Sequence, residues 1–451
     1  MTGIWRALKT FPYKKLHRSI GPSAIFRYFS SNSESSYIII GNGPIGASVA
    51  KHLAASLKGK HSPHKITMID GRPSGMGSSH ADRARLIRTF DAEGNVEWTN
   101  WNKRSLEAFP ELERLWNINN NGRHEESFFT QCGALLLGDE AFVARSKQAA
   151  EDSDPLPLSS QSSFSVLSPN ECQAKWPYLQ PKEGCDVALF DPLGGIIDPL
   201  ALIQAQNCIA NAGNDNNFRF EILSGIATNI RDQTVELASG EVLTATEKII
   251  VCGGAYSDSL LDHSGIQSSR ADVESPRASK RTVALLEVNE KLVGGILKDM
   301  PTIKYAFGLT GQSGATIGEH SRVEAGSVYI LPPVHYPEKG GKWFIKIGGG
   351  PNEFFEGDTD DKQLLDDWLS SDGDPLSAEW LGEIATSLLS GICFDSVQSM
   401  ACVTTTMSTD SSGVIVDDVS GDGSLIAISA CQGKGVGPSD AIGADIVKRI
   451  L

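Results

Sequence analysis

Three glycines and one aspartate near the start of the chain have the types and spacing needed to hold a nucleotide. The apolar run Tyr37–Ile40 leads into Gly41-x-Gly43-x-x-Gly46 and then into a helical pattern. Glycines so placed permit a tight turn, a close backbone approach to a pyrophosphate and close helix packing. Asp70 ends a second apolar strand twenty-four residues after Gly46, where a carboxylate can accept both ribose hydroxyls. This order predicts a dinucleotide site, with NAD and FAD both open; the alternative is a glycine-rich turn that binds nothing.

Basic residues further along could act on a substrate. Residues 83–88 contain three arginines beside an apolar pair. A guanidinium fork can hold a carboxylate by two parallel hydrogen bonds and so orient the carbon to be oxidised, although a solvated or structural salt bridge is the commoner fate of an arginine. Lys346 interrupts the apolar strand pattern Phe344–Gly348. If it points inward, its ammonium can stabilise negative charge in a dry site; if outward, it is the polar half of an alternating strand.

Several elements are expected to position these residues. The spacing of Trp98 to Trp116 predicts an amphipathic core helix broken near Pro110, and residues 128–138 predict a strand pair. Asp198 and Pro199 are placed as N-cap and first turn of a helix over residues 200–212. Further strands are expected on both sides of the turn at residues 238–241 and at residues 248–251, 282–288, 328–331 and 343–347, the last three in an antiparallel sheet.

Composition excludes several classes of protein. The 451 residues allow two or three domains, and 40% apolar and 21% charged residues are typical of a soluble globular protein. No apolar run approaches the length of a transmembrane segment. The net charge of −15 argues against a nucleic-acid partner. Eight scattered cysteines without a CxxC pair or a His/Cys cluster favour reduced thiols over disulfides or a zinc site, so no metal ligand is expected.

The first 35 residues differ from the rest. Six basic residues precede the first acidic residue, Glu34, and are mixed with serine, aromatic and aliphatic residues, as in a transit peptide. Residues 27–31 resemble a mitochondrial cleavage site, and loss of residues 1–29 would take the net charge from −15 to −21. We expect residues 1–35 to be a targeting peptide for the mitochondrial matrix; a plastid signal and a disordered basic tail of a cytoplasmic protein are the alternatives.

Ser78-Ser79-His80 leading into Arg85-Leu86-Ile87-Arg88, downstream of the glycine turn, resembles the D-amino-acid-oxidase (DAO) superfamily, nearest to its sarcosine oxidase and N-methyl-amino-acid oxidase branch. The resemblance implies an α/β fold with a discontinuous Rossmann-like FAD-binding domain and an inserted α+β substrate domain built on an antiparallel sheet. The implied bounds are residues 36–123, 191–271 and 400–451 for the FAD-binding domain, and 124–190 and 272–399 for the substrate domain.

The same resemblance implies site residues. Arg88 would hold a substrate carboxylate, Tyr329 would face the substrate, and Lys346 would lie over the flavin and hold a water. Cys402 is a candidate for a thioether bond to the flavin, with a buried free cysteine as the alternative. The residues assigned to FAD are Gly41, Gly43, Pro44, Ile45, Gly46, Asp70, Ser79, Arg85, Gly254, Ala255, Cys402, Gly433, Lys434 and Gly435.

The sequence departs from the family pattern mainly around the substrate. Thr404 replaces a tyrosine, Gly437 stands where the N-methyl-amino-acid oxidases have a lysine, and Gly348 to Gly350 stand where a histidine is usual. Tyr256 also stands where tryptophan is more usual, and there is one extra residue between His80 and Arg85. The cofactor half of the pattern is therefore the better match.

The resemblance implies oxidation of the C–N bond of a small amine or amino acid, such as an N-methyl amino acid. Hydride passes to flavin N5, the imine hydrolyses, and dioxygen reoxidises the flavin to give hydrogen peroxide. One alternative is a mitochondrial flavin dehydrogenase that passes electrons to another carrier. The other is a non-catalytic flavoprotein that assists the assembly of a respiratory complex.

Overall fold

The computed structural model describes residues 34–451, apart from residues 73–77, 121–126, 156–163, 183, 267–275, 308–325, 351, 356–361, 407–413 and 430. The predicted targeting peptide at residues 1–35, with its cleavage site, lies almost entirely outside the described residues. Import into mitochondria therefore stays a prediction.

A six-stranded sheet carries the glycine turn. Its order is β20-β21-β13-β1-β2-β9, parallel except between β20 and β21. Three separated stretches of chain supply it, as the discontinuous fold predicts. The strands are β1 (Ser35–Ile40), β2 (His64–Asp70), β9 (Phe218–Ser224), β13 (Lys248–Val251), β20 (Ile415–Asp418) and β21 (Leu425–Ser429).

Both faces of this sheet are covered, which explains the continuous apolar run in β1. Ile39 packs among residues of α1 (Pro44–Leu57) and α10 (Ser439–Ile450), while Ile38 and Ile40 pack on the other face against a small antiparallel sheet. That small sheet contains β10 (Ala227–Arg231), β11 (Thr234–Leu237) and β12 (Val242–Thr244). The turn between β11 and β12 confirms the strand-turn-strand prediction.

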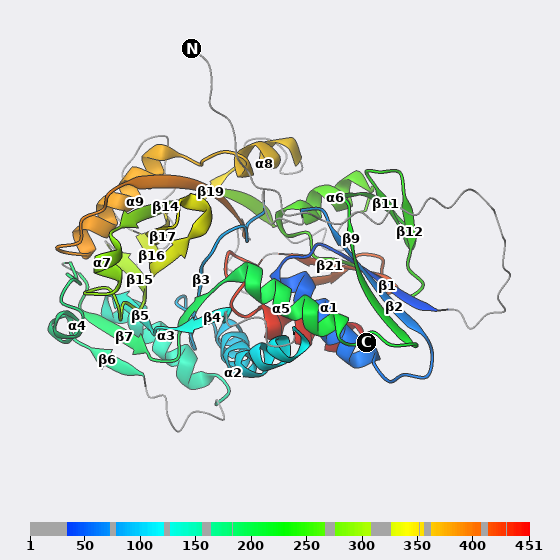
Figure 1. Cartoon of the computed structure of the whole chain (residues 1–451), viewed down its shortest axis with the longest axis horizontal. Coiled ribbons are helices and arrows are strands. Elements are labelled where there is room, and N and C mark those ends of the chain that lie inside the picture. Colours follow the sequence, from blue (N-terminus) through cyan, green and yellow to red (C-terminus); the bar gives the residue numbers. More distant parts are fainter. Residues whose placement is uncertain are drawn as a thin grey trace, which may run out of the picture. The chain divides into compact units, whose positions relative to one another are not determined.

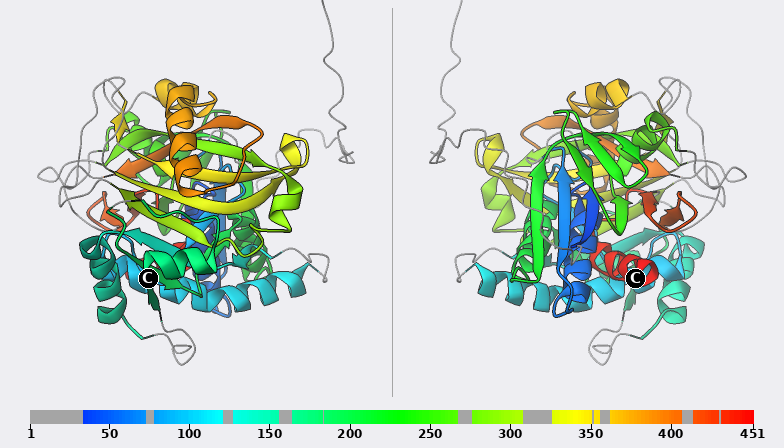
Figure 2. Two further views of the ribbon diagram at one scale, coloured as in Figure 1. Left: turned by 90° about the vertical axis from the view of Figure 1, so that its left-hand side faces the viewer. Right: turned by 90° about the vertical axis from the view of Figure 1, so that its right-hand side faces the viewer.

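Helices α1 and α10 lie side by side, although they come from opposite ends of the described chain (Figure 2). A β-carbon at Gly443 would overlap Ser48, so glycine lets the two helices approach closely. The Lys51 ammonium forms a buried ion pair with Asp440, and the Ser48 hydroxyl donates to the Asp440 carbonyl at 3.2 Å. The last helix therefore completes the packing of the first.

A nine-stranded sheet lies beside the six-stranded sheet, at the left of the view in Figure 1. Its order is β18-β14-β17-β16-β15-β5-β7-β6, with β19 paired to β14; only β15 and β5 are parallel. The predicted antiparallel strands over residues 282–288, 328–331 and 343–347 are confirmed. The strands are β5 (Ala134–Gly138), β6 (Ser165–Leu167), β7 (Val187–Asp191), β14 (Arg277–Val288), β15 (Thr302–Phe307), β16 (Gly326–Tyr336), β17 (Lys342–Gly349), β18 (Glu353–Phe354) and β19 (Val397–Thr406).

The predicted strand pair at residues 128–138 is wrong in one respect. Two strands form there, but they do not pair with each other. The first, β4 (Phe129–Gln131), pairs with β8 (Gly195–Ile197), which also pairs with β3 (Arg85–Ile87), whereas β5 joins the nine-stranded sheet. Gly133, with φ at +81°, turns the chain between them. The three-stranded sheet β3-β8-β4 therefore carries the start of the Arg85–Arg88 segment.

The predicted helix at Trp98–Trp116 exists, but the break near Pro110 is wrong. Helix α2 runs from Val96 to Asn119 with Pro110 inside it, and the Asn95 side chain accepts from Trp98 N at its start. Phe109, Leu112 and Trp116 are buried on one face, so their packing offsets the missing backbone donor.

The other helices mostly begin at clear capping residues. Helix α5 (Pro199–Asn211) confirms its predicted start, because the Asp198 side chain accepts from Leu200 N and Ala201 N. The remaining helices are α3 (Glu140–Asp152), α4 (Pro169–Lys175), α6 (Ser257–His263), α7 (Glu290–Val293), α8 (Lys362–Leu369) and α9 (Pro375–Leu388), with two 3-10 turns, η1 (Gly254–Tyr256) and η2 (Pro337–Lys339).

The predicted domain bounds stay a prediction, although the sheets follow them in outline. Strand β19 pairs with β14 from residue 397 to residue 406, across the predicted bound at residue 400. Among the described residues, no helix is both long and apolar enough to cross a bilayer.

Candidate functional site

A cavity of about 910 Å³ collects nearly all the predicted site residues. Its lining includes both glycine turns, the Arg85–Arg88 segment and one face of the nine-stranded sheet. Two predicted residues, Gly46 and Lys346, are absent from that lining. The predicted residues that do line it are Gly41, Gly43, Pro44, Ile45, Asp70, Ser79, Arg85, Arg88, Gly254, Ala255, Tyr329, Cys402, Gly433, Lys434 and Gly435. Their individual roles stay predictions.

The first glycine turn has the shape that a phosphate cradle requires. Gly41 has φ at +107°, and a β-carbon there would overlap the Cys252 backbone; at Gly46 it would overlap the Gly41 carbonyl. Gly46 therefore acts by letting α1 pack against the strand. No side chain caps the N-terminus of α1, so its first amides remain available to an anion at Gly43.

Asp70 lies at the end of β2, as predicted, with its carboxylate already oriented. It accepts from Asn42 Nδ2 at 3.1 Å and from Arg72 N at 3.0 Å. The Arg72 guanidinium in turn donates to Tyr256 and forms an ion pair with Asp366 of α8. Tyr256, which replaces the usual tryptophan, thus joins α8 to the cofactor side of the cavity.

One face of the nine-stranded sheet points toward the cavity. Residues paired across strands share a face, and the register pairs Lys304 with Tyr329, Leu331 with Lys346, and Arg281 with Cys402. Their neighbours Ile303, Ile330 and Ile345 point to the opposite face and pack in the core that α9 covers.

Gly348 explains one departure from the family pattern. A β-carbon there would lie 2.6 Å from the Tyr329 ring, so the tyrosine occupies the space that a side chain at Gly348 would need. Tyr329 itself lines the cavity.

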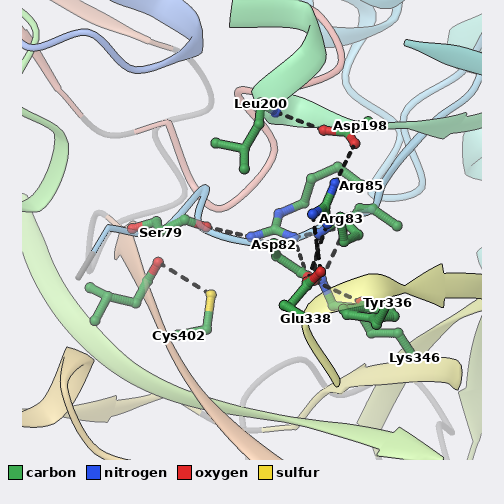
Figure 3. Close-up of polar contacts among 12 residues, drawn as sticks. Ser79, Asp82, Arg83, Arg85, Asp198, Leu200, Tyr336, Glu338, Lys346 and Cys402 are labelled. Atoms are coloured by element: carbon green, nitrogen blue, oxygen red, sulfur yellow. Dashed lines mark hydrogen bonds and ion pairs between the residues drawn. The ribbon is translucent and has the colours of Figure 1, made fainter. Parts of the chain in front are cut away.

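Lys346 is only 1% exposed, so it is not the solvent-facing half of an alternating strand. Its predicted place over the flavin stays a prediction. Its ammonium is held by the Asp82 carboxylate and by the Ala84 carbonyl at 3.1 Å (Figure 3). The same carboxylate accepts from Arg85 Nη1 at 2.6 Å and from the Tyr336 hydroxyl at 2.8 Å. Asp82 therefore joins the Arg85 segment to two strands of the nine-stranded sheet.

The opposite charges in this cluster shift the pKa values of its members. Burial alone would raise the pKa of Asp82, but Lys346 and Arg85 lower it well below the usual value. Burial and the charge of Arg85 lower the pKa of Lys346, and Asp82 opposes that change. His80, which lines the cavity beside Gly43, has its pKa lowered to about 4 by burial and by Arg85, so it is neutral at pH 7.

The second glycine turn is fixed by ion pairs. Gln432 and Gly433 have φ at +51° and +70°, and Lys434 follows them. The Lys434 ammonium lies 2.9 Å from Asp91 Oδ1 and 2.5 Å from Glu93 Oε2. Lys434, assigned to the cofactor from the sequence, is thus also the residue that ties this turn to the segment after Arg88.

Arg88 is the basic residue best placed to take a ligand. It is 9% exposed and lines the cavity. Its Nε donates to the Phe90 carbonyl at 3.2 Å, and no described residue accepts a hydrogen bond from its two terminal nitrogens. Those two nitrogens form the fork that a carboxylate would bridge.

Three cysteines line the cavity, and their surroundings differ. Burial raises the pKa of Cys252 and raises that of Cys431 to about 12, so both stay as thiols. Cys402 lies opposite Arg281 on the neighbouring strand. Arg85 and Arg281 line the same cavity as Cys402.

Three residues of the site, Asp82, Glu93 and Lys304, were not predicted from the sequence. Lys304 carries the same signal that singled out Lys346, a lysine between apolar strand residues, here Ile303 and Tyr305. The two carboxylates have no comparable signal, because most of their partners, Lys346 and Tyr336 for Asp82 and Lys434 for Glu93, are distant in sequence. Among the described residues, no group of His, Cys, Asp or Glu side chains is placed to hold a metal ion.

The Asp82 cluster predicts a specific loss of stability. Replacing Asp82 by Asn leaves Lys346 and Arg85 buried without their shared carboxylate, which we expect to lower the free energy of unfolding at pH 7 by about 3–5 kcal/mol. Tyr336→Phe is the matched control, because it removes one hydrogen bond and no charge, at a cost of about 0.5–1.5 kcal/mol.

The effect should also depend on pH. Since the folded pKa of Asp82 is lowered, its carboxylate stabilises the fold above the unfolded pKa of about 3.9 and loses this contribution as the pH falls toward the folded pKa. Urea unfolding at pH 7 and pH 3 should therefore show a smaller difference between wild type and D82N at pH 3. Equal costs for D82N and Y336F at pH 7 would contradict this assignment.

Comparison with proteins of known structure finds the same fold over nearly the whole chain. A variant of NikD, an amino acid oxidase essential for nikkomycin biosynthesis, has a TM-score of 0.64 at 14% identity and covers 93% of this chain and 94% of its own. Glycine oxidase from Bacillus cereus has a TM-score of 0.60 at 17% identity, with 92% and 95% covered. L-proline dehydrogenase from P. horikoshii has a TM-score of 0.64 at 15% identity, with 92% and 93% covered. At such identities the likeness shows the fold alone.

Comparison with curated protein sequences returns no match. The family model described as "DAO: FAD dependent oxidoreductase" matches residues 36–449, nearly all of the chain that the structure describes. This confirms the predicted superfamily, the predicted fold class and FAD as the cofactor, and the glycine turns and Asp70 fit that cofactor. The chain belongs to the DAO family of FAD-dependent oxidoreductases.

Proposed function

We propose that this enzyme oxidises the C–N bond of a small amino acid, either a primary amine or an N-methyl amine. The observation that carries the proposal is Arg88, a buried guanidinium whose terminal nitrogens have no partner among the described residues and which lines the cofactor cavity. Three structural neighbours are named as enzymes of amino acids, an amino acid oxidase, a glycine oxidase and an L-proline dehydrogenase.

The residues of the chain bind and orient the substrate. The Arg88 fork holds the substrate carboxylate, which fixes the position of the adjacent carbon and nitrogen. Tyr329, whose ring packs over Gly348, limits the space on the sheet side of the cavity. FAD, when bound, supplies the chemistry by accepting a hydride from the carbon next to nitrogen, which leaves an imine for hydrolysis.

Two described carboxylates lie in this part of the cavity, Asp91 and Glu93. Both form ion pairs with Lys434, and Glu93 also pairs with Lys304, so neither is well placed to act as a base. We therefore propose that the amine reacts in its neutral form, and that Arg88 contributes orientation rather than proton transfer.

Anaerobic reduction of the flavin tests this function. The panel contains N-methyl amino acids, D-amino acids and glycine, each compared with a matched amine that lacks the carboxylate. We expect some of the amino acids, and none of the matched amines, to bleach the yellow flavin. Arg88→Ala should raise the concentration for half-maximal bleaching about 100-fold, because two charge-assisted hydrogen bonds are lost.

Arg83→Ala is the matched control, since Arg83 belongs to the same segment but pairs with Glu338 and does not line the cavity. It should leave the bleaching concentration unchanged. If no amino acid bleaches the flavin, or if both variants have the same effect, the proposed function fails.

The electron acceptor has two candidates. Dioxygen near Lys346, with release of hydrogen peroxide, is the one that the family resemblance implies. A second carrier protein or quinone is favoured by one observation, namely that the Lys346 ammonium is paired with Asp82 and lies outside the cavity lining. An ammonium already paired with a carboxylate would stabilise negative charge on dioxygen only weakly.

We expect the ion-paired lysine to make reoxidation by air slow. After anaerobic reduction, the rate at which the yellow colour returns would be measured with air and with an artificial electron acceptor, and peroxide would be assayed. Fast return in air with stoichiometric peroxide would establish dioxygen as the acceptor and exclude the carrier. Fast return with the artificial acceptor alone would support the carrier.

We further propose that Cys402 is the attachment point of the flavin. It lines the cavity and lies opposite Arg281 on the neighbouring strand. After acid precipitation, the yellow colour should remain with the wild-type protein and with Cys431→Ser, and should pass into the supernatant for Cys402→Ser. Release of all colour from the wild type would exclude a covalent bond.

A further inference from the structure

We propose that the cavity selects amino acids with a second anionic group, because Arg88 and Lys304 form two separate anion-binding positions. This inference rests on the proposed function and names its substrate class. The substrate is an amino acid, primary or N-substituted, whose side chain ends in a carboxylate or a comparable anion.

Lys304 is a cation without a hydrogen bond. It comes from β15 in the middle of the nine-stranded sheet, and its side chain is 14% exposed and lines the cavity. Its nearest carboxylate oxygen is Glu93 Oε1 at 3.9 Å, too far for a hydrogen bond, and no other described residue accepts one from its Nζ. Three donor hydrogens are thus available to a ligand.

The two carboxylates nearby are already occupied. Asp91 Oδ1 accepts from Lys434, and its Oδ2 accepts from the backbone of Glu93 at 3.1 Å and of Asn95 at 3.2 Å. Glu93 Oε2 pairs with Lys434 at 2.5 Å, and its Oε1 forms a longer ion pair with Lys304 at 3.9 Å. A cationic side chain of a substrate would therefore have to compete with two lysines for these carboxylates.

The charges at this end of the cavity do not balance. Arg88, Lys304 and Lys434 face Asp91 and Glu93, an excess of one positive charge. A single substrate carboxylate on Arg88 would cancel that excess of charge. Support for a second anion comes instead from the donors of Lys304, which that carboxylate would leave unused.

Arg88 and Lys304 also repel each other. Burial lowers the pKa of Lys304, and the charges of Arg88 and Lys434 lower it further, while Glu93 and Asp91 oppose the change. A ligand with two anionic groups relieves this repulsion at both positions. Tyr329 of β16 pairs with Lys304 of β15 and lies on the same face of the sheet. Strand β16 separates β15 from β17.

Calorimetric titration of the FAD-loaded protein tests this selectivity without turnover. The probes are succinate and glutarate, compared with butyrate and valerate, which have the same chain lengths and one carboxylate each. We expect each dicarboxylate to bind about 10- to 100-fold more tightly than its monocarboxylate, the effect of one additional charge-assisted contact.

In Lys304→Met, the affinity ratio of dicarboxylate to monocarboxylate should fall to about one. Lys304→Arg keeps the charge and should preserve most of the ratio, which guards against a folding defect as the cause. Lys298→Met, a change at an exposed lysine outside the cavity, is the matched control and should leave the ratio unchanged. Equal binding of mono- and dicarboxylates by the wild type, or a ratio that survives K304M, would overturn the proposal.

The titration judges this proposal separately from the proposed function. Flavin reduction by no amino acid would defeat the function, whereas the binding ratio depends only on the two cations. Conversely, N-methylalanine and N-methylaspartate could give half-maximal flavin bleaching at the same concentration. That result would support the proposed function and contradict the second anion position.

Discussion

The Asp82 carboxylate is the interaction on which the rest of the site depends. It is buried, and it accepts from Lys346 of β17, Tyr336 of β16 and Arg85 of β3. These three elements belong to two sheets, so one side chain sets the distance between the arginine segment and the cavity-facing strands. Removing a carboxylate from water is unfavourable unless cations surround it, and here two cations do. The position of Arg88, three residues after Arg85, follows from this anchor.

The cofactor side could be predicted largely from the sequence, because its signals are local. Gly46 is required by the Gly41 carbonyl five residues away, and Gly41 by its own φ of +107°, although a β-carbon there would also meet the distant Cys252 backbone. The N-cap role of Asp198 is equally local. The wrong prediction at Pro110 shows the limit of such reasoning, since buried side chains elsewhere on α2 outweigh the local cost of proline.

The substrate side could not be predicted in the same way, because its contacts join residues far apart in sequence. Lys346 meets Asp82 across 264 positions, and Lys434 meets Asp91 across 343. A sequence pattern identifies a lysine in an apolar strand but not the carboxylate that it will meet. Lys304 and Lys346 lie in equivalent sequence patterns but have different surroundings. Lys346 donates hydrogen bonds to Asp82 and Ala84, whereas Lys304 has no hydrogen bond to a described residue. Only the strand register and the packing of the two sheets separate them.

The packing of α10 against α1 has a consequence for how the protein acquires its cofactor. The strand β21 adjoins β13, and Gly443 must meet Ser48 before the glycine turn is covered on its helical side. Residues 433–435 of the same region complete the cavity wall. A ribosome-bound chain that lacks these segments has the first glycine turn but no enclosure around it. We therefore expect stable uptake of FAD to follow the synthesis and folding of β21, residues 433–435 and α10, so the topology sets the order of folding and cofactor loading.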